Sequence, residues 1–260
     1  MSDIKKVEKG SSKPLRKKTN KKPKPLNILV ACEESQAITK ELRKLKHNAF
    51  SCDLLPCSGG KAKWHFNMDV FKVIKNKGGK LQNGESVKVD KWDMMIAHPP
   101  CTYLAVSGAR WYYHPDDKDK PINERRRHPL HEKRAELREE AVEFFLKLWK
   151  VKIEKVVIEN PIGIMSKRLF PPTQIVHPWM FGDKASKATC LWIRGLDKLV
   201  INKNKFVDKG DYLEFPSGKK MQKWYAEALA KAKTPEQRRT LRSKTFPGMA
   251  SAMAKQWTKQ

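Results

Sequence analysis

The feature that most constrains this chain is an alternation of short, almost wholly apolar runs with amphipathic helical patterns, which begins at Leu26. Apolar runs of four to eight residues are typical of strands buried on both faces of a parallel sheet. Strands that alternate with helices predict an α/β fold with a mainly parallel sheet. We expect the strands at 26–32, 48–56, 93–101 and 153–161, and helices at 33–47 and 134–150.

The remaining elements are predicted from weaker patterns. A short third strand should end near Asp69, and the turn-rich residues 76–91 should form a loop. Two further strands are expected at 187–196 and 197–201, and a polar stretch at 202–218. Helices should follow at 219–233 and from about Pro247 to the last residue.

The charge of the chain indicates a polyanionic partner. The 260 residues carry a formal net charge of +27, of which residues 1–25 hold +8 and the rest +19. The first 25 residues lack the apolar side chains needed for a core, so we expect them to be disordered. They are interpreted as a nucleic-acid arm or nuclear-localisation patch, or alternatively as a solubilising tail. A basic body beside a basic tail favours phosphate binding.

Several classes of protein are excluded by what the sequence does not contain. It has no apolar run near the roughly 18 residues that span a bilayer, and its first residues lack the apolar centre of a signal peptide. Five Cys in a chain of this length do not form a disulfide framework. We therefore expect an intracellular protein without a membrane partner. The scattered His and the unpaired spacing of Cys52 and Cys57 predict no metal site.

Polar side chains gather where the predicted strands end, which is where ligands bind in open parallel sheets. Cys101 follows two prolines, and a thiol on a rigid loop suits nucleophilic catalysis, although a buried structural Cys is the alternative. Glu159 lies between Ile158 and Asn160-Pro161, a setting that can raise a carboxyl pKa and make it an acid. An ion pair with Lys or Arg at a sheet edge is the alternative for Glu159.

These residues carry a resemblance to a known family. Pro99-Pro100-Cys101 after an apolar strand, followed by a strand that ends in Glu159-Asn160, resembles the DNA cytosine-5 methyltransferases, in particular a short divergent group from phages and other viruses. The resemblance runs in order along residues 26–260. It implies a Rossmann-like fold that uses S-adenosyl-L-methionine. It also implies Cys101 as the nucleophile at C6 of a cytosine flipped out of duplex DNA, Glu159 at N3 of that base, and, for a viral protein, the host nucleus or cytoplasm.

The same resemblance implies a cofactor site. Asp53 would bind the ribose hydroxyls, Asp69 would meet the adenine amino group, and Pro100 would lie beside the cofactor. The first loop would contribute Ala31, Glu33 and Ser35, and the segment TFPGMA would contribute Ala250. The family's first loop is rich in Gly, whereas VACEESQAI has none. Either Glu33 or Glu34 binds the methionine ammonium by charge, or this loop does not bind the cofactor in the usual pose.

The nucleic-acid contacts are predicted from cations and aromatic rings. The family's Gln-x-Arg-x-Arg motif is missing, so Lys184, Lys187 or Arg194 would supply its charge near the cytosine O2, Arg194 in a catalytic role. The insertion between the two catalytic motifs offers phosphate-binding and stacking side chains and has the length of a lid. Its alternative is a solvated loop with a small aromatic core. The expected DNA-binding residues are Arg110, Trp111, Arg125, Arg126, Arg127 and Lys187.

We therefore divide the chain into a basic tail (1–25), a methyltransferase core (26–195), a small recognition region (196–240) and a C-terminal helix that returns to the core (241–260). About 45 residues for recognition predict short or relaxed sequence specificity, because base readout needs several placed side chains. A monomer is assumed. Two alternatives remain open: the same fold acting on RNA, on a cytosine nucleotide or with another alkyl donor, and a non-enzymatic nucleic-acid-binding protein on a decayed scaffold.

Overall fold

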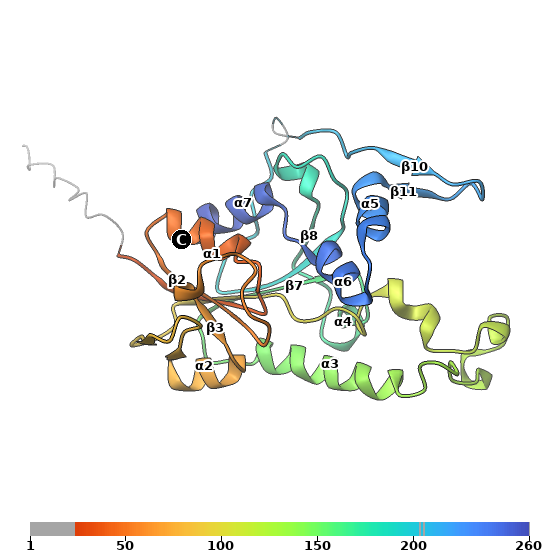
Figure 1. The fold of residues 1–260 in the computed structure, drawn as a ribbon, viewed down its shortest axis with the longest axis horizontal. Helices are drawn as coiled ribbons and strands as arrows, with labels where there is room; N and C mark the ends of the chain where they lie inside the picture. Colours follow the sequence, from red (N-terminus) through yellow and green to blue (C-terminus); the bar gives the residue numbers. More distant parts are fainter. Residues whose placement is uncertain (1–23, 203, 205, 260) are drawn as a thin grey trace, which may run out of the picture.

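A seven-stranded sheet forms the centre of the molecule in the computed structural model, which describes residues 24–202, 204 and 206–259 (Figure 1). The predicted basic tail therefore lies outside the described residues except for Lys24 and Pro25. The sheet order is β3-β2-β1-β6-β7-β9-β8, and only β9 runs antiparallel to its neighbours. The strands are β1 (Asn27–Ala31), β2 (Asn48–Asp53), β3 (His65–Asn67), β6 (Met94–Ala97), β7 (Lys155–Pro161), β8 (Gln174–Val176) and β9 (Thr189–Arg194).

This architecture confirms the predicted α/β class with a mainly parallel sheet, and it is consistent with a Rossmann-like methyltransferase fold. The chain winds outward from β1 through β2 to β3, then returns to place β6 on the other side of β1. The reversal makes a crevice beyond the carboxyl ends of β1 and β6, which is where open α/β sheets bind their ligands. The residues that follow these two strands are therefore the first place to look for a site.

Helices cover both faces of the sheet (Figure 1). The helices α1 (Ala37–Lys44) and α7 (Pro247–Trp257) share one apolar cluster, and α7 contacts α1 directly. On the other face lie α2 (Val70–Asn76) and α3 (Arg134–Trp149). The C-terminal helix thus packs against the first helix of the fold.

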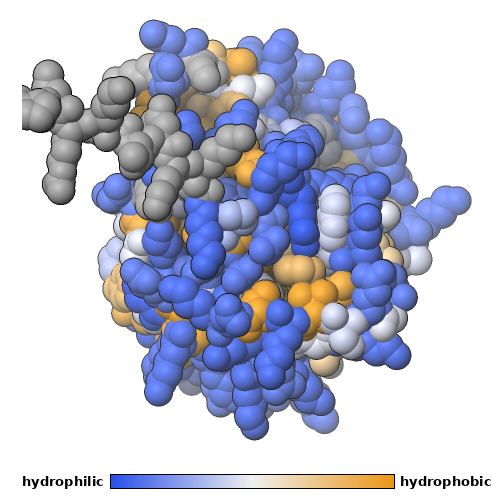
Figure 2. Space-filling model, turned by 90° about the vertical axis from the view of Figure 1, so that its left-hand side faces the viewer, coloured by the Kyte–Doolittle hydropathy of each residue, from blue (hydrophilic) through white to orange (hydrophobic). Residues whose placement is uncertain are grey.

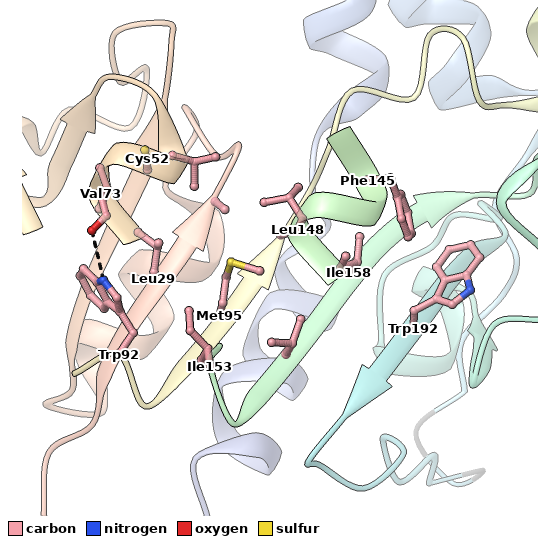
Figure 3. Packing of buried hydrophobic residues seen from close by; sticks show 14 of the residues in the cluster. Leu29, Cys52, Val73, Trp92, Met95, Phe145, Leu148, Ile153, Ile158 and Trp192 are labelled. Atoms are coloured by element: carbon pink, nitrogen blue, oxygen red, sulfur yellow. Dashed lines mark hydrogen bonds between the residues drawn. The ribbon is translucent and has the colours of Figure 1, made fainter. Parts of the chain in front are cut away.

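The larger core cluster holds the sheet against α2 and α3 (Figure 3). Leu29, Met95 and Ile158 project from neighbouring strands, and Phe145 from α3 meets Trp192 from β9 edge-on with ring centroids 5.1 Å apart. The indole nitrogen of Trp92 donates to the Val73 carbonyl at 3.4 Å. The burial of aromatic rings on several strands fixes the sheet rigidly, so the loops at its edge start from defined positions.

The prediction for residues 76–91 was wrong in part. Instead of an irregular loop, they contain the hairpin of β4 (Gly78–Lys80) and β5 (Ser86–Lys88). Gly78 has a φ of +144°, and a Cβ there would stand 2.0 Å from the Val87 carbonyl oxygen, so the hairpin closes only around a glycine. Val87 and Val89 pack against the larger core cluster, which draws the segment into order.

The prediction of a strand at 197–201 was also wrong. The side-chain amide of Gln174 takes both backbone groups of Leu199, accepting from its N–H and donating to its carbonyl at 2.9 Å, so this segment is tied to the edge without forming a strand. The strand that forms this edge of the sheet, beside β9, is β8 and not residues 197–201. The helix expected at 219–233 begins later, because β11 (Lys220–Gln222) pairs with β10 (Tyr212–Glu214) before α5 (Lys223–Lys231) starts.

Two short helices complete the fold. The helix α4 (Met165–Arg168) follows β7, and α6 (Pro235–Ser243) follows α5 with the Thr234 hydroxyl capping its first turn. The boundary predicted between 240 and 241 falls inside α6. Within the described residues, no helix combines the length and the apolar character needed to cross a membrane.

Candidate active site at the carboxyl ends of β6 and β7

The loops that follow β6 and β7 are bonded to each other along their length. Asn160 donates its side-chain amide to the Pro99 carbonyl at 2.9 Å. Beyond it, the Val106 N–H donates to the Ile162 carbonyl and the Ile164 N–H to the Leu104 carbonyl, at 3.0 and 2.9 Å. These bonds fix the segment that carries Cys101 relative to the strand that carries Glu159.

A close approach of the two backbones makes this bonding possible. A Cβ on Gly163 would stand 2.1 Å from the Leu104 carbonyl oxygen, so no other residue fits there without separating the loops. Asn160, which follows Glu159, has a structural role: its buried side-chain amide holds the loop that contains Pro99. The sequence placed both motifs at strand ends, but only the tertiary structure shows how Asn160 and Gly163 join them.

Glu159 contacts the imidazole of His98, the residue that follows β6. The His98 Nδ1 lies 3.1 Å from Glu159 Oε2, and their side chains are 12% and 16% exposed. Burial by itself raises the pKa of Glu159, but the hydrogen bond from His98 and the charge of Lys187 outweigh it, so that pKa lies below its ordinary value. The expected raised pKa of Glu159 was wrong for this reason.

Cys101 lies between one negative and two positive neighbours. Burial and the charge of Glu159 raise the pKa of its thiol, whereas Lys187 and Arg242 lower it in part. The net pKa stays above the ordinary value, so the thiol is protonated at neutral pH in this state of the site. The cations come from the segment before β9 and from α6, far from Cys101 in the sequence.

A narrow pocket adjoins the His98–Glu159 pair. Lys187 and Thr189 line one side, and the segment that leads into α7 lines the other. From that segment come Thr245, Phe246 and Met249, part of the TFPGMA stretch singled out in the sequence. The fold thus joins the last motif to the end of β7.

The first loop obtains its sharp turn without glycine. Cys32 and Gln36 have positive φ values of 57° and 59°, in the left-handed region that costs a residue with a Cβ of order 1–2 kcal/mol. The Gln36 amide offsets this cost, donating to the Lys61 carbonyl and to Ser51 Oγ. A Cβ on Gly59 would stand 2.5 Å from the Ser35 carbonyl oxygen, so the glycine that allows close approach belongs to the facing loop.

Two carboxylates stand near this loop. Asp53 ends β2 and accepts from the Leu55 N–H, and Asp69 caps α2 by accepting from the Lys72 N–H, both at 2.9 Å. Both charges raise the pKa of Cys52, which burial raises most, to about 12, and they act on Cys32 in the same direction. The structure therefore brings Asp53 and Asp69 together, although Asp69 follows β3 by two residues and begins a helix.

The other predicted cofactor residues occupy unequal positions. Glu33 is buried, and its carboxylate accepts from the N–H groups of Ile38 and Thr39 and from the Thr39 hydroxyl. Both carboxylate oxygens of Glu33 are thus bound to the first turn of α1. The remaining placements are as follows: Ala31 and Ala250 are core residues, Ser35 is half-buried and Pro100 is exposed.

Arg194 is separated from Cys101 and Glu159. It pairs with Val156 at the start of β7, and its guanidinium donates to the carbonyls of Trp149, Val151 and Ile153. These bonds hold the end of α3 at the end of the strands opposite to Cys101 and Glu159. Lys187, the other candidate cation, lines the pocket beside Glu159, so it replaces Arg194 in the site.

The insertion between the two motifs uses its arginines largely for its own fold. Arg126 forks onto Asp117, with both nitrogen–oxygen distances 2.9 Å, and holds the pKa of that carboxyl well below its usual range. Arg127 pairs with Glu136, and Arg125 donates to the carbonyls of Lys118 and Lys120 at 2.7 Å.

Trp111 and Arg110 form the aromatic part of this insertion. The Trp111 ring packs edge-on to His128 and His131, with centroids 5.3 and 5.2 Å apart, and the Arg110 guanidinium lies 4.8 Å from that ring. This agrees with the small aromatic core weighed as the alternative. The side chains of Arg126 and Arg127 remain 59% exposed, so their outer faces are open to a second partner.

Sequence reasoning missed Arg242, because α6 was not predicted. The signal was present: Thr234 followed by Pro235 is a helix-start pattern. Among the described residues, no group of three His, Cys, Asp or Glu is close enough to hold a metal ion.

Comparison with known proteins gives likenesses among solved structures. No family model and no curated protein matches the sequence. Among solved structures, the Entamoeba histolytica methyltransferase EhMeth is similar over 71% of this chain, with 13% sequence identity and a TM-score of 0.37. This chain spans 58% of that structure's length.

Proposed function

We propose that this protein transfers a methyl group from S-adenosyl-L-methionine to C5 of cytosine in DNA. One observation carries the proposal: Cys101 follows β6, Glu159 lies near the end of the adjacent parallel strand β7, and Asn160 and backbone bonds join the two segments. A thiol and a carboxyl held in this way are the two groups that addition to a pyrimidine ring requires. The sequence specificity is short or relaxed, and the active unit is a monomer.

The residues divide the chemistry between them. Cys101 loses its proton to water, and its sulfur adds to C6 of the cytosine. Glu159 delivers a proton to N3, so that the ring electrons moved by the addition come to rest on a neutral nitrogen. Lys187 stabilises the thiolate and lies beside Glu159, where it can meet the cytosine O2. Bound S-adenosylmethionine supplies an electrophilic methyl group at C5. Loss of the C5 proton to water then expels the Cys101 thiolate, and N3 returns its proton to Glu159.

The donor and acceptor chemistry beside the first loop fits the nucleoside half of that cofactor. Carboxylates only accept hydrogen bonds, and the ribose hydroxyls and the adenine amino group are donors. Asp53 and Asp69 supply two carboxylates near the turn at Cys32, beyond the strands where such ligands bind. Asp53 would hold the ribose, Asp69 the adenine amino group, and Thr245 and Phe246 the region toward the methionine end.

Charge supports a nucleic-acid partner. The chain carries +27, and hydrophilic side chains cover most of the face shown in Figure 2, with apolar residues only in small patches. Cations spread over a surface bind the phosphate backbone, and the binding weakens steeply with salt. The exposed outer faces of Arg110, Arg126 and Arg127 add cations on the insertion that follows Cys101.

The deciding experiment traps the covalent intermediate. The full chain is incubated with tritiated S-adenosylmethionine and duplex DNA that contains 5-fluorocytosine, and the products are separated under denaturing conditions. Fluorine at C5 cannot leave as a proton, so the wild-type protein should remain bound to methylated DNA in a 1:1 adduct. Cys101→Ala should give none, while Cys190→Ala, which removes another buried cysteine, should still give it.

Nucleoside mass spectrometry identifies the substrate. DNA from cells that express the protein should contain 5-methylcytosine, and DNA from cells expressing Cys101→Ala should not. Methylated cytosine found in RNA alone would favour the RNA alternative. No adduct and no methylated nucleoside, with S-adenosylmethionine unbound in calorimetry, would favour the non-enzymatic alternative.

A further inference from the structure

His98 is held as firmly as the two groups assigned to the reaction. Its backbone N–H donates to the Ala31 carbonyl at 2.9 Å, and the following Pro99 is fixed by Asn160. Its Nδ1 faces Glu159 at 3.1 Å, and Nε2 is buried without a hydrogen-bond partner among the described residues. The backbone on both sides of His98 is therefore fixed, and its imidazole lies largely buried against Glu159.

The surrounding charges decide where the proton of this pair lies. Glu33 reaches the imidazole from the loop before α1, where its negative charge interacts with His98. Glu159 faces it from β7, and Lys187 and Lys244 line the same pocket from the segments before β9 and before α7. Cys101 adds a thiol beside Glu159. The hydrogen bond from His98 and the charge of Lys187 favour the ionised form of Glu159.

This distribution creates a difficulty for the proposed reaction. Glu159 must hold a proton when sulfur adds to the ring, yet its pKa is lowered by His98 and Lys187 after burial has raised it. An ionised Glu159 would face the lone pair of cytosine N3 with a second lone pair. The proton has to come from a neighbour that stays in contact with the carboxylate, and His98 is the group that touches it.

We propose that His98 is a positioning residue that stores the proton which Glu159 delivers to cytosine N3. As the Cys101 sulfur forms its bond to C6, the C5–C6 π electrons shift toward C4 and the C4–N3 π electrons settle on N3. N3 takes the proton from Glu159, and Glu159 takes the proton from His98 Nδ1, which leaves a neutral imidazole. When the C5 proton leaves and sulfur departs, N3 returns its proton through Glu159 to His98. No proton is gained or lost by the pair over one turnover.

The inference rests on the proposed function. The variant His98→Asn separates the hydrogen bond that His98 donates to Glu159 from the proton that His98 supplies. An Asn side chain places an amide N–H near the position of Nδ1, so it can still donate to Glu159, but it holds no exchangeable charge. His47→Asn is the matched control, because His47 is also buried and accepts from the Leu26 N–H on another part of the molecule. Melting temperature and S-adenosylmethionine affinity are measured for each to confirm that they fold.

Single-turnover methylation is then followed against pH. We expect His98→Asn to slow the reaction by ~10²-fold near neutral pH, the lower end of the range for one assisted proton transfer, with S-adenosylmethionine affinity and KM for DNA unchanged. A carboxyl ordinarily loses its proton about two pH units below an imidazole. The rate of the variant should therefore start to fall at lower pH than that of the wild type, and its loss should shrink in acid. A loss that is equal at every pH, or no loss, would overturn the inference.

An independent measurement tests the pair without any reaction. Nitrogen-15 spectra of the full chain, labelled at histidine, should contain one slowly exchanging Nδ1 proton that disappears in Glu159→Ala and persists in His47→Asn. Its absence from the wild type would overturn the inference even where the covalent adduct forms. Failure of the adduct while this proton is observed would instead count against cytosine methylation, and it would overturn the role of His98 in delivering a proton to that base.

Discussion

Two cysteines follow adjacent central strands at their carboxyl ends, and the charged neighbours of the two thiols act in opposite directions. Cys32 follows β1 and Cys101 follows β6. Burial raises the pKa of both thiols, but Asp53, Cys52 and Asp69 raise that of Cys32 further, whereas Lys187 and Arg242 lower that of Cys101 in part. A place at the end of a strand does not make a nucleophile. The charges brought to it by other segments decide which thiol can become a thiolate.

The largest expected effect comes from exchanging each sulfur for oxygen. Cys101→Ser should lower methyl transfer by at least about 10³-fold, since removal of a nucleophile leaves only the residual catalysis of binding and orientation. Cys32→Ser should keep most of the activity. Single-turnover assays with equal amounts of folded protein measure both. Equal losses in the two variants would erase the distinction between the cysteines.

Glu159→Gln should lower the rate by about 10²–10⁴-fold, the usual range for loss of general acid catalysis. The same change should make Cys101 easier to ionise, because a negative neighbour is removed. The variant should therefore react faster with iodoacetamide while it methylates more slowly. Alkylation followed by intact mass measures the first, and labelled-methyl transfer the second. If both rates fell, the carboxyl would have a structural role only.

On the cofactor side, Asp53→Asn should weaken binding of S-adenosylmethionine by roughly tenfold or more, because hydrogen bonds to charged groups contribute about 1.5–3 kcal/mol. The rate at saturating cofactor should change little. Calorimetry gives the affinity, and Asp93→Asn, which alters another partly buried carboxylate that accepts from the Asn27 N–H, is the matched control. A change in the rate at saturating cofactor with unchanged affinity would mean that Asp53 acts in methyl transfer and not in cofactor binding.

The smallest effect concerns the cations. The neutral substitutions Lys187→Met and Arg242→Met each remove a charge that lowers the pKa of Cys101, so each should move the pH profile of alkylation toward higher pH. Below the midpoint, the rate at a given pH should fall. Alkylation of Cys101, separated from that of the other cysteines by peptide mapping, measures the shift. A profile that stayed in place would mean that the two cations act on DNA alone.

Much of the fold could be predicted because local patterns agree with the tertiary structure. The apolar runs that became β1, β6 and β7 are buried on both faces, and Pro99 and Pro100 end one of them as expected. The hairpin of β4 and β5 and the edge strand β8 could not be predicted. Val87 orders the hairpin by packing against the larger core cluster, and Gln174 ties β8 to Leu199. No repeated pattern in the sequence marks such contacts.

The candidate site divides in the same way. Cys101 and Glu159 could be chosen because each follows an apolar run, and strand ends of a parallel sheet meet at one edge. Arg194 was chosen as a cation that could replace the missing Gln-x-Arg-x-Arg motif, and it lies at the opposite end of the strands, because β9 runs antiparallel and its last residue faces the start of β7. Strand direction is a property of the sheet and cannot be read from the strand alone.

By itself, the sequence determined the α/β class with its mainly parallel sheet and the excess of positive charge, and it placed Cys101 and Glu159 near strand ends. These follow from hydrophobic period and composition, which are local. Only the tertiary structure decided that His98 faces Glu159, that Glu33 is bound to α1, and that Lys187 and Arg242 act on Cys101. Ionisation depends on distances between charges and on their burial, and residues far apart in the chain acquire both only when it folds.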